Sequence, residues 1–86
     1  MIKKEAIIRA STGLHARSAT LLVRKASSFK SDIYLDFEDK KANAKSLINV
    51  LSLGVRKGSK ISITANGDDE TLAAEEMYKL IEDLKE

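Results

Sequence analysis

Alternation of apolar and polar residues predicts four β-strands along the chain. The clearest is residues 32–37, where isoleucine, leucine and phenylalanine occupy every second position, as in a strand with one face on a core. Residues 2–8 alternate less regularly, and residues 60–65 repeat the clear pattern. Residues 40–43 are expected to form a short partner strand at a sheet edge, because the two lysines there suit solvent exposure.

Apolar residues spaced three or four apart predict the helices. This period runs through residues 16–27 and begins again at Asp69, and it is typical of half-buried helices. Between these segments, residues 47–53 are mostly apolar and lie between Ser46 and Gly54. Serine favours a helix start and glycine favours a helix end, so the pattern predicts a third, two-turn helix there.

The predicted element order is therefore βαββαβα. We expect an α+β fold in the form of an open-faced two-layer sandwich, with a four-stranded antiparallel sheet and three helices on one face. The chain has 86 residues, and a length of this order leaves too little material for a second core. Residues 1–86 are therefore predicted to form a single domain.

Composition excludes several classes of protein. The chain has one histidine and no cysteine, so neither disulfides nor a metal site is expected, and no cofactor is implied. The formal charge is only +2, and the basic residues are interpreted as scattered, which disfavours nucleic-acid binding. Neither a leader peptide nor a membrane-length apolar stretch is predicted, so we expect no membrane insertion and a cytoplasmic location.

The segment around His15 is the strongest candidate for chemistry. It places an imidazole at the first turn of the helix predicted for residues 16–27, with Arg17 two residues later. The first turn of a helix has unpaired N–H groups and a positive dipole end, so the backbone of Ala16, Arg17 and Ser18 could hold an anion attached to the ring. The arginine adds a forked, charged donor. These features favour reversible phosphoryl transfer through the histidine.

A lone histidine more often has a structural role, such as capping a helix. Here Gly13 precedes the segment, and the small residues Ala16 and Ala19 leave the ring uncrowded. The neighbours of His15 therefore favour a functional role. A free-standing enzyme is disfavoured, because no second titratable group or phosphate-binding glycine loop accompanies it.

The segment after Ser46 allows two interpretations. The serine could simply cap the predicted helix, or it could also be a phosphorylation site, because the start of a helix tolerates added negative charge. The helix itself has more apolar residues than it can easily bury on one side, which predicts an exposed patch for a partner. We expect the patch to comprise Leu47, Ile48 and Leu51, near the His15 end of the first helix, with a basic rim of Arg17, Arg24 and Lys45.

The motifs Gly13-Leu14-His15-Ala16-Arg17 with Ala19-Thr20, and Lys45-Ser46-Leu47 with Val50-Leu51-Ser52-Leu53-Gly54, resemble the two signatures of the HPr family. This is the family of histidine phosphocarriers of the bacterial phosphoenolpyruvate-dependent sugar phosphotransferase system. The resemblance implies that enzyme I phosphorylates His15 at Nδ1 and that the group then passes to the A domain of a sugar-specific enzyme II. It also implies an ATP-dependent kinase (HPr kinase/phosphorylase) acting on Ser46, a catabolite-repression regulator, and Thr20 on the partner surface.

Two positions depart from that family's usual pattern. Ser18 stands where proline is usual, and Asn49 stands where many members have glycine. Serine could give the phosphate another donor, or it could loosen a turn that proline would hold. Because of Asn49, the resemblance supports the kinase and regulator contacts less strongly than it supports the histidine chemistry.

Two rival functions remain open. One is a regulatory paralogue acting mainly in catabolite repression, which would not require an imidazole at residue 15. The other is a small basic nucleic-acid-binding module, whose binding would depend on salt. The sugar served cannot be inferred from this chain, and a monomer is the default expectation.

Overall fold

The computed structural model describes residues 1–84 and contains the elements that the hydrophobic pattern predicts. In chain order they are β1 (Ile2–Ile7), α1 (Ala16–Ser27), β2 (Asp32–Phe37), β3 (Lys40–Asn43), α2 (Leu47–Ser52), β4 (Lys60–Asn66) and α3 (Glu70–Asp83). The bounds of α1, β2 and β3 are those predicted, and the predicted bounds of the other elements differ from the observed ones by at most one residue. None of the helices in residues 1–84 combines the length and apolar character that crossing a membrane requires.

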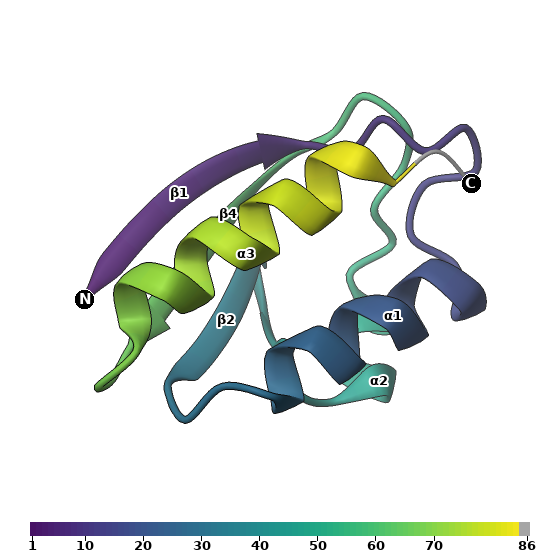
Figure 1. Ribbon diagram of the computed structural model, residues 1–86. Helices are drawn as coiled ribbons and strands as arrows, with labels where there is room; N and C mark the ends of the chain where they lie inside the picture. Colours follow the sequence, from purple (N-terminus) through teal and green to yellow (C-terminus); the bar gives the residue numbers. More distant parts are fainter. Residues whose placement is uncertain (85–86) are drawn as a thin grey trace.

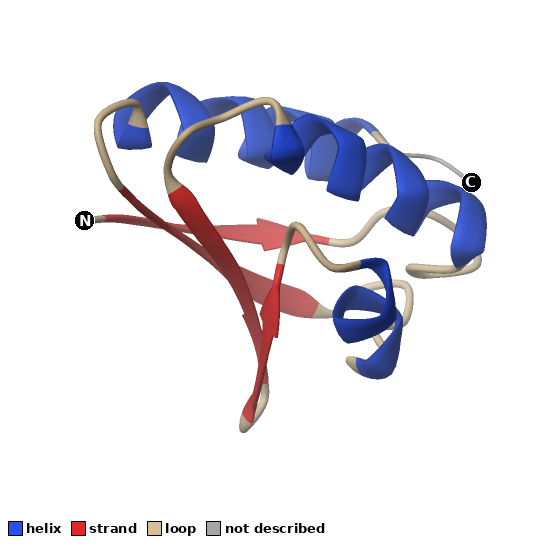
Figure 2. Ribbon diagram, turned by 90° about the horizontal axis from the view of Figure 1, so that it is seen from below, coloured by secondary structure: helices blue, strands red, loops and turns tan. Residues whose placement is uncertain are grey.

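The four strands form one antiparallel sheet in the order β1-β4-β2-β3. The predicted fold class is confirmed. Figure 2 shows the sheet as one layer and the helices gathered on one face of that sheet. Helix α3 runs along β1 and β4, and α1 lies beside α2 at the lower end of the molecule in Figure 1. The loops that start α1 and follow α2 therefore lie at the same side of the fold.

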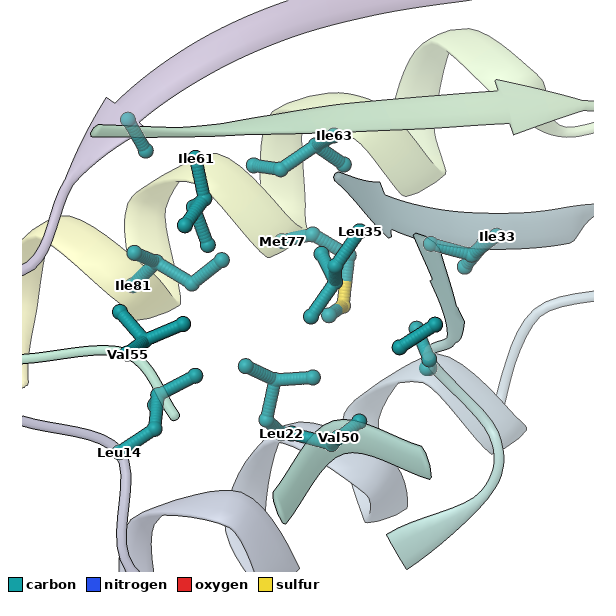
Figure 3. Packing of buried hydrophobic residues seen from close by; sticks show 14 of the residues in the cluster. Leu14, Leu22, Ile33, Leu35, Val50, Val55, Ile61, Ile63, Met77 and Ile81 are labelled. Atoms are coloured by element: carbon teal, nitrogen blue, oxygen red, sulfur yellow. The ribbon is translucent and has the colours of Figure 1, made fainter. Parts of the chain in front are cut away.

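The core lies between the sheet and the helices (Figure 3). Alternate residues of the strands face inward, and Leu22 of α1 and Val50 of α2 are fully buried against them together with Met77 and Ile81 of α3. The strand contribution comes from every second residue, as the sequence pattern predicts. The opposite face of the sheet carries mainly polar side chains, among them Lys3, Ser62 and Thr64.

Asp69 fastens the loop between α1 and β2 to the start of α3. Its carboxylate accepts the backbone N–H groups of Lys30 and Ser31, each at 2.9 Å, and the hydroxyl of Ser31, which is fully buried. Asp69 is the N-cap of α3, at the helix start that the sequence predicts, but its side chain makes no cap hydrogen bond to α3. It serves a tertiary contact instead.

These hydrogen bonds predict acid sensitivity. The hydroxyl of Ser31 and the N–H of Lys30, which bond to the charged form, lower the pKa of Asp69 from 3.8 to about 2. A lowered pKa stabilises the fold fully above about pH 4, and that contribution disappears as the pH falls toward 2. We expect Asp69→Asn to lower the free energy of unfolding at pH 7, and the difference from wild type to shrink between pH 4 and pH 2. Urea unfolding across this range measures both.

The matched control is Asp68→Asn, a change at the neighbouring exposed carboxylate. It should leave the unfolding free energy at pH 7 nearly unchanged. A constant difference between wild type and Asp69→Asn from pH 7 to pH 2 would contradict the assigned role of the Asp69 charge.

Candidate functional site

His15 is the N-cap of α1, and its ring is turned toward the helix start. The backbone N–H of Arg17 donates to Nδ1 of His15 at 3.3 Å. A ring nitrogen that accepts a hydrogen bond cannot carry the proton, so in the neutral imidazole the proton is on Nε2. The capping role that sequence analysis weighed against function is therefore real. The same bond also leaves the Nδ1 lone pair in line with the donors of the helix.

Ser18 closes the same turn from the other side. Its side chain is buried, and its Oγ accepts the backbone N–H of His15 at 3.1 Å while donating to the carbonyl oxygen of His15 at 3.2 Å. Together with the ring of His15 it forms a capping-box arrangement. The sequence left open whether Ser18 loosens the turn or donates to a phosphate. Its hydroxyl is bonded to the backbone of His15, so it holds the turn together.

Gly13 brings the His15 loop against the loop that follows α2. The N–H of Leu14 donates to the carbonyl oxygen of Val55 at 3.1 Å. Gly13 has a φ of +71°, and a Cβ on it would lie 2.4 Å from that carbonyl oxygen and 2.8 Å from Cα of Arg56. Only glycine fits so close an approach with this backbone conformation. The position of His15 therefore depends on two loops rather than one.

The charges around the site are segregated, which corrects the view of scattered basic residues. Residues 9–31 and 40–67 contain no aspartate or glutamate, yet they hold most of the lysines and arginines. These segments include α1, α2 and the loops that flank both helices. Folding brings the two helices together, so their cations are concentrated on this side, where carboxylates enter only from other elements, as in the pair of Lys25 with Glu76 of α3 at 3.1 Å. Arg17 is exposed there beside His15.

The predicted partner residues of α2 lie at the surface. Ile48 is 76% exposed, and Leu47 and Leu51 are each 38% exposed. These three side chains are called the α2 apolar patch below. Of the predicted neighbours on α1, Arg24 is exposed, whereas Thr20 is half-buried and its hydroxyl donates to the carbonyl of Ala16 at 2.6 Å.

Lys45 lies away from the position that sequence analysis gave it. Its Nζ donates to the carbonyl oxygen of Phe29 at 2.9 Å, at the far end of α1 from His15. Phe29 lies two residues beyond the last residue of α1, so the ammonium is near the negative end of the helix dipole, where a cation is favoured. The start of α2 thus lies near the end of α1, and the loop after α2 lies near the start of α1.

Ser46 is the N-cap of α2, and its Oγ accepts the N–H of Asn49 at 3.4 Å. Gly54 follows the helix with a φ of +66°, as expected for a glycine that ends a helix. Ser46 is half-buried. Because the two helices run in opposite directions, Ser46 and His15 lie near opposite ends of the α1–α2 pair.

Sequence reasoning missed the loop after α2 as part of the site. Val55 and Arg56 are more than forty positions from Gly13 in the chain, and no local pattern pairs them. A glycine two residues before a candidate functional histidine was the only available signal. No group of three or more His, Cys, Asp or Glu side chains in residues 1–84 could hold a metal ion.

Comparison with known proteins shows which family this chain resembles in sequence and structure. Residues 2–83 match the model described as "PTS HPr component phosphorylation site". The chain is 44% identical to phosphocarrier protein HPr of Borreliella burgdorferi over 86 residues, which is the whole of both chains. The chain belongs to the HPr family. It is accordingly a phosphocarrier of the phosphotransferase system, as the resemblance of its two motifs implied.

Solved structures of this family have the same fold. HPr from Thermoanaerobacter tengcongensis superimposes with a TM-score of 0.92 at 44% identity, covering 95% of this chain and 92% of that one. The catabolite-repression protein Crh of Bacillus subtilis, solved as a dimer with a swapped domain, has a TM-score of 0.79 at 36% identity, covering 100% and 99%. The family therefore includes a relative named for repression.

The contact at Gly13 can be tested against a second glycine of similar conformation. Gly54 has a φ of +66°, and a Cβ there would meet nothing within 4 Å. Gly54→Ala should therefore cost only the left-handed backbone penalty, about 1–2 kcal/mol. Gly13→Ala should cost that penalty and roughly 1–3 kcal/mol more, because the methyl group must push the loops apart. Urea unfolding of both variants measures the difference.

In Gly13→Ala, amide NMR signals of residues 14–17 and 55–56 should also shift, and in Gly54→Ala those of residues 14–17 should not. Equal destabilisation by the two variants would show that the close approach at Gly13 is unimportant.

Proposed function

We propose that the chain accepts a phosphoryl group on Nδ1 of His15 from phosphorylated enzyme I and donates it to the A domain of a sugar-specific enzyme II. The observation that carries this proposal is the hydrogen bond from the Arg17 N–H to Nδ1 of His15, at 3.3 Å. It makes Nδ1 the unprotonated, nucleophilic nitrogen. It also places a backbone donor next to the atom where the phosphoryl group would be attached.

The transfer needs little from this chain beyond positioning. As the Nδ1–P bond forms, the bond between phosphorus and the donor group on enzyme I breaks, and Nε2 of His15 keeps its proton. The N–H of Arg17 loses its acceptor when Nδ1 bonds to phosphorus, so it becomes available to a phosphoryl oxygen. The start of α1 and the guanidinium of Arg17 add positive potential there.

This division of labour supports a carrier rather than an enzyme. Proton transfer and activation of the donor are left to the partner proteins, because His15 has no carboxylate in its own segment to act as a base. We therefore assign the backbone N–H groups of Ala16, Arg17 and Ser18, together with the guanidinium of Arg17, to holding the phosphate. The protein itself is phosphorylated and dephosphorylated by its partners, in the cytoplasm, as a single domain without a cofactor.

The partner surface is proposed to be the α2 apolar patch with the exposed cations of α1. An apolar centre with a charged rim is the usual composition of a transient interface, and the concentration of cations in the α1 and α2 segments favours acidic partners. Arg17 and Arg24 are the exposed cations of α1 that we assign to the rim, and Thr20 lies between them in the sequence of that helix. Lys45 marks the far limit of this surface, because its ammonium is engaged with Phe29.

Regulation at Ser46 is a second proposal, favoured by its position as the N-cap of α2 beside the patch. A phosphate on its oxygen would add about −1.5 to −2 charges next to a surface that favours acidic partners. The modified form would then bind enzyme I less well and be available to a catabolite-repression regulator. The likeness to Crh makes a purely regulatory paralogue the alternative, and the histidine at residue 15 favours the carrier.

Labelling with phosphoenolpyruvate tests the carrier function. Incubation with Mg²⁺, phosphoenolpyruvate and enzyme I should attach one acid-labile phosphate, and His15→Ala should abolish it. Arg17→Gln should slow the labelling by about tenfold or more, because a charge-assisted hydrogen bond contributes about 1.5–3 kcal/mol. Omission of enzyme I is the control. Failure of the wild-type chain to be labelled would refute the carrier function.

A separate labelling experiment tests the proposed phosphorylation of Ser46. Incubation with ATP and an HPr kinase should give an acid-stable phosphate that Ser46→Ala removes. Ser52→Ala is the matched control, since Ser52 is an exposed serine in the same helix whose hydroxyl donates to the carbonyl of Ile48 at 2.7 Å; it should keep the label. A label that persists in Ser46→Ala would place the modification elsewhere.

A further inference from the structure

Arg56 lies where the loop after α2 meets the His15 loop. Its Cα is one of the atoms that a Cβ on Gly13 would overlap, at 2.8 Å, and the preceding residue accepts the N–H of Leu14 at 3.1 Å. His15 follows Leu14 directly in the chain. Because consecutive Cα atoms are about 3.8 Å apart, Cα of His15 lies no more than about two such steps from Gly13.

The loop that carries Arg56 is held in place by backbone contacts. The N–H of Arg56 donates to Oγ of Ser59 at 3.3 Å. The N–H of Gly58 donates to the carbonyl oxygen of Ile8 at 2.7 Å, and the N–H of Ile8 donates to the carbonyl oxygen of Ser59 at 2.9 Å. These bonds tie the loop to the segment leading from β1 to His15. The position of Arg56 relative to His15 is thus set by the fold.

The side chain of Arg56 is available for an anion. The residue is exposed, and it takes part in no ion pair among residues 1–84. No carboxylate occurs in either segment that forms this side of the molecule, residues 9–31 and 40–67. Arg56 therefore carries a guanidinium with no carboxylate partner among residues 1–84 on a backbone that contacts the His15 loop, and such a group suits the binding of phosphate.

We propose that Arg56 is a second phosphate-binding arginine of the site, which stabilises the phosphorylated form of His15 relative to the free form. This inference rests on the proposed function and extends it. Arg17 approaches the phosphoryl group from α1, and Arg56 approaches it from the loop after α2. The close packing at Gly13 then also serves phosphate binding, because it holds the backbone of Arg56 against the loop that carries His15.

A competition for phosphoryl groups tests the proposal. Wild type and Arg56→Gln are mixed in equal amounts with a catalytic quantity of enzyme I, Mg²⁺ and limiting phosphoenolpyruvate. Enzyme I then exchanges phosphoryl groups between the two proteins until equilibrium. Intact-mass spectrometry reads the phosphorylated fraction of each, because the substitution changes the mass. Affinity for enzyme I does not affect this equilibrium, so the measurement isolates the stability of the phosphohistidine.

We expect the ratio of phosphorylated to free protein to be about threefold to tenfold higher for wild type than for Arg56→Gln at low salt, the range of a solvent-accessible charge-assisted contact. The preference should fall toward unity at about 1 M salt, where screening is strong. Arg56→Lys should recover part of it, since the charge remains and the fork is lost.

Lys57→Gln is the matched control, because Lys57 is the neighbouring exposed cation on the same loop and one residue farther from the Gly13 contact. It should partition evenly with wild type. Even partition of Arg56→Gln with wild type would overturn the inference, even if its rate of transfer changed, since a change of rate alone would assign Arg56 to partner docking. An equal shift in Lys57→Gln would also overturn it, because the effect would then be a general one of loop charge.

Thermal unfolding of Arg56→Gln should superimpose on that of wild type, which shows that the fold is retained. If wild type acquires no label from enzyme I at all, the proposed carrier function has failed. A labelled wild type that partitions evenly leaves that function standing and rejects only the role of Arg56.

Discussion

The first backbone N–H groups of a helix have no carbonyl partners within the helix, and α1 meets this constraint with a histidine ring. Nδ1 of His15 accepts the N–H of Arg17, while the hydroxyl of Ser18 accepts the N–H of His15 itself. An N-cap of serine or aspartate would satisfy the same donor without offering a nucleophilic nitrogen. Under the proposed function the histidine is both a structural cap and the phosphoryl acceptor, so the two hypotheses from sequence are compatible.

Under the proposed function this arrangement would link the free and phosphorylated states. In the free state the N–H of Arg17 is satisfied by Nδ1; with phosphorus on Nδ1, a phosphoryl oxygen can take the place of the ring nitrogen. The helix start therefore keeps a partner in both states, and little reorganisation accompanies transfer in either direction. A carrier needs such balance, because a group that is held too firmly cannot be passed on. Exposed cations from α1 and from the loop after α2 would raise affinity for the group while leaving it accessible to the next partner.

Local patterns predicted the elements well because each has a short-range cause. The alternation in residues 32–37, the serine before α2 and the glycine after it act within a few residues. The chemistry proposed for His15 likewise depends on a local pattern, since Arg17 follows it on the same helix turn. What could not be predicted were the contacts between distant segments. Asp69 bonds to the loop before β2, and Lys45 bonds to Phe29.

The contact between Gly13 and Arg56 is of the same kind: periodicity reveals which face of an element is buried but not which loop meets which. Charge segregation was missed for a related reason. The net charge of +2 is an average over the whole chain, whereas the absence of carboxylates from two separated segments becomes meaningful only when folding places those segments together. Their separation in sequence made the basic residues look scattered.

The antiparallel placement of α1 and α2 also constrains how Ser46 could influence His15. Helix α2 has six residues and spans about 9 Å at 1.5 Å per residue, and it lies between the two sites. That span already exceeds the Debye length of about 8 Å at physiological ionic strength. Direct repulsion between phosphates on the two residues would therefore be weak through solvent. The α2 apolar patch lies between them and would be covered by any partner that reaches His15, so a charge at Ser46 acts most strongly on the approach of that partner.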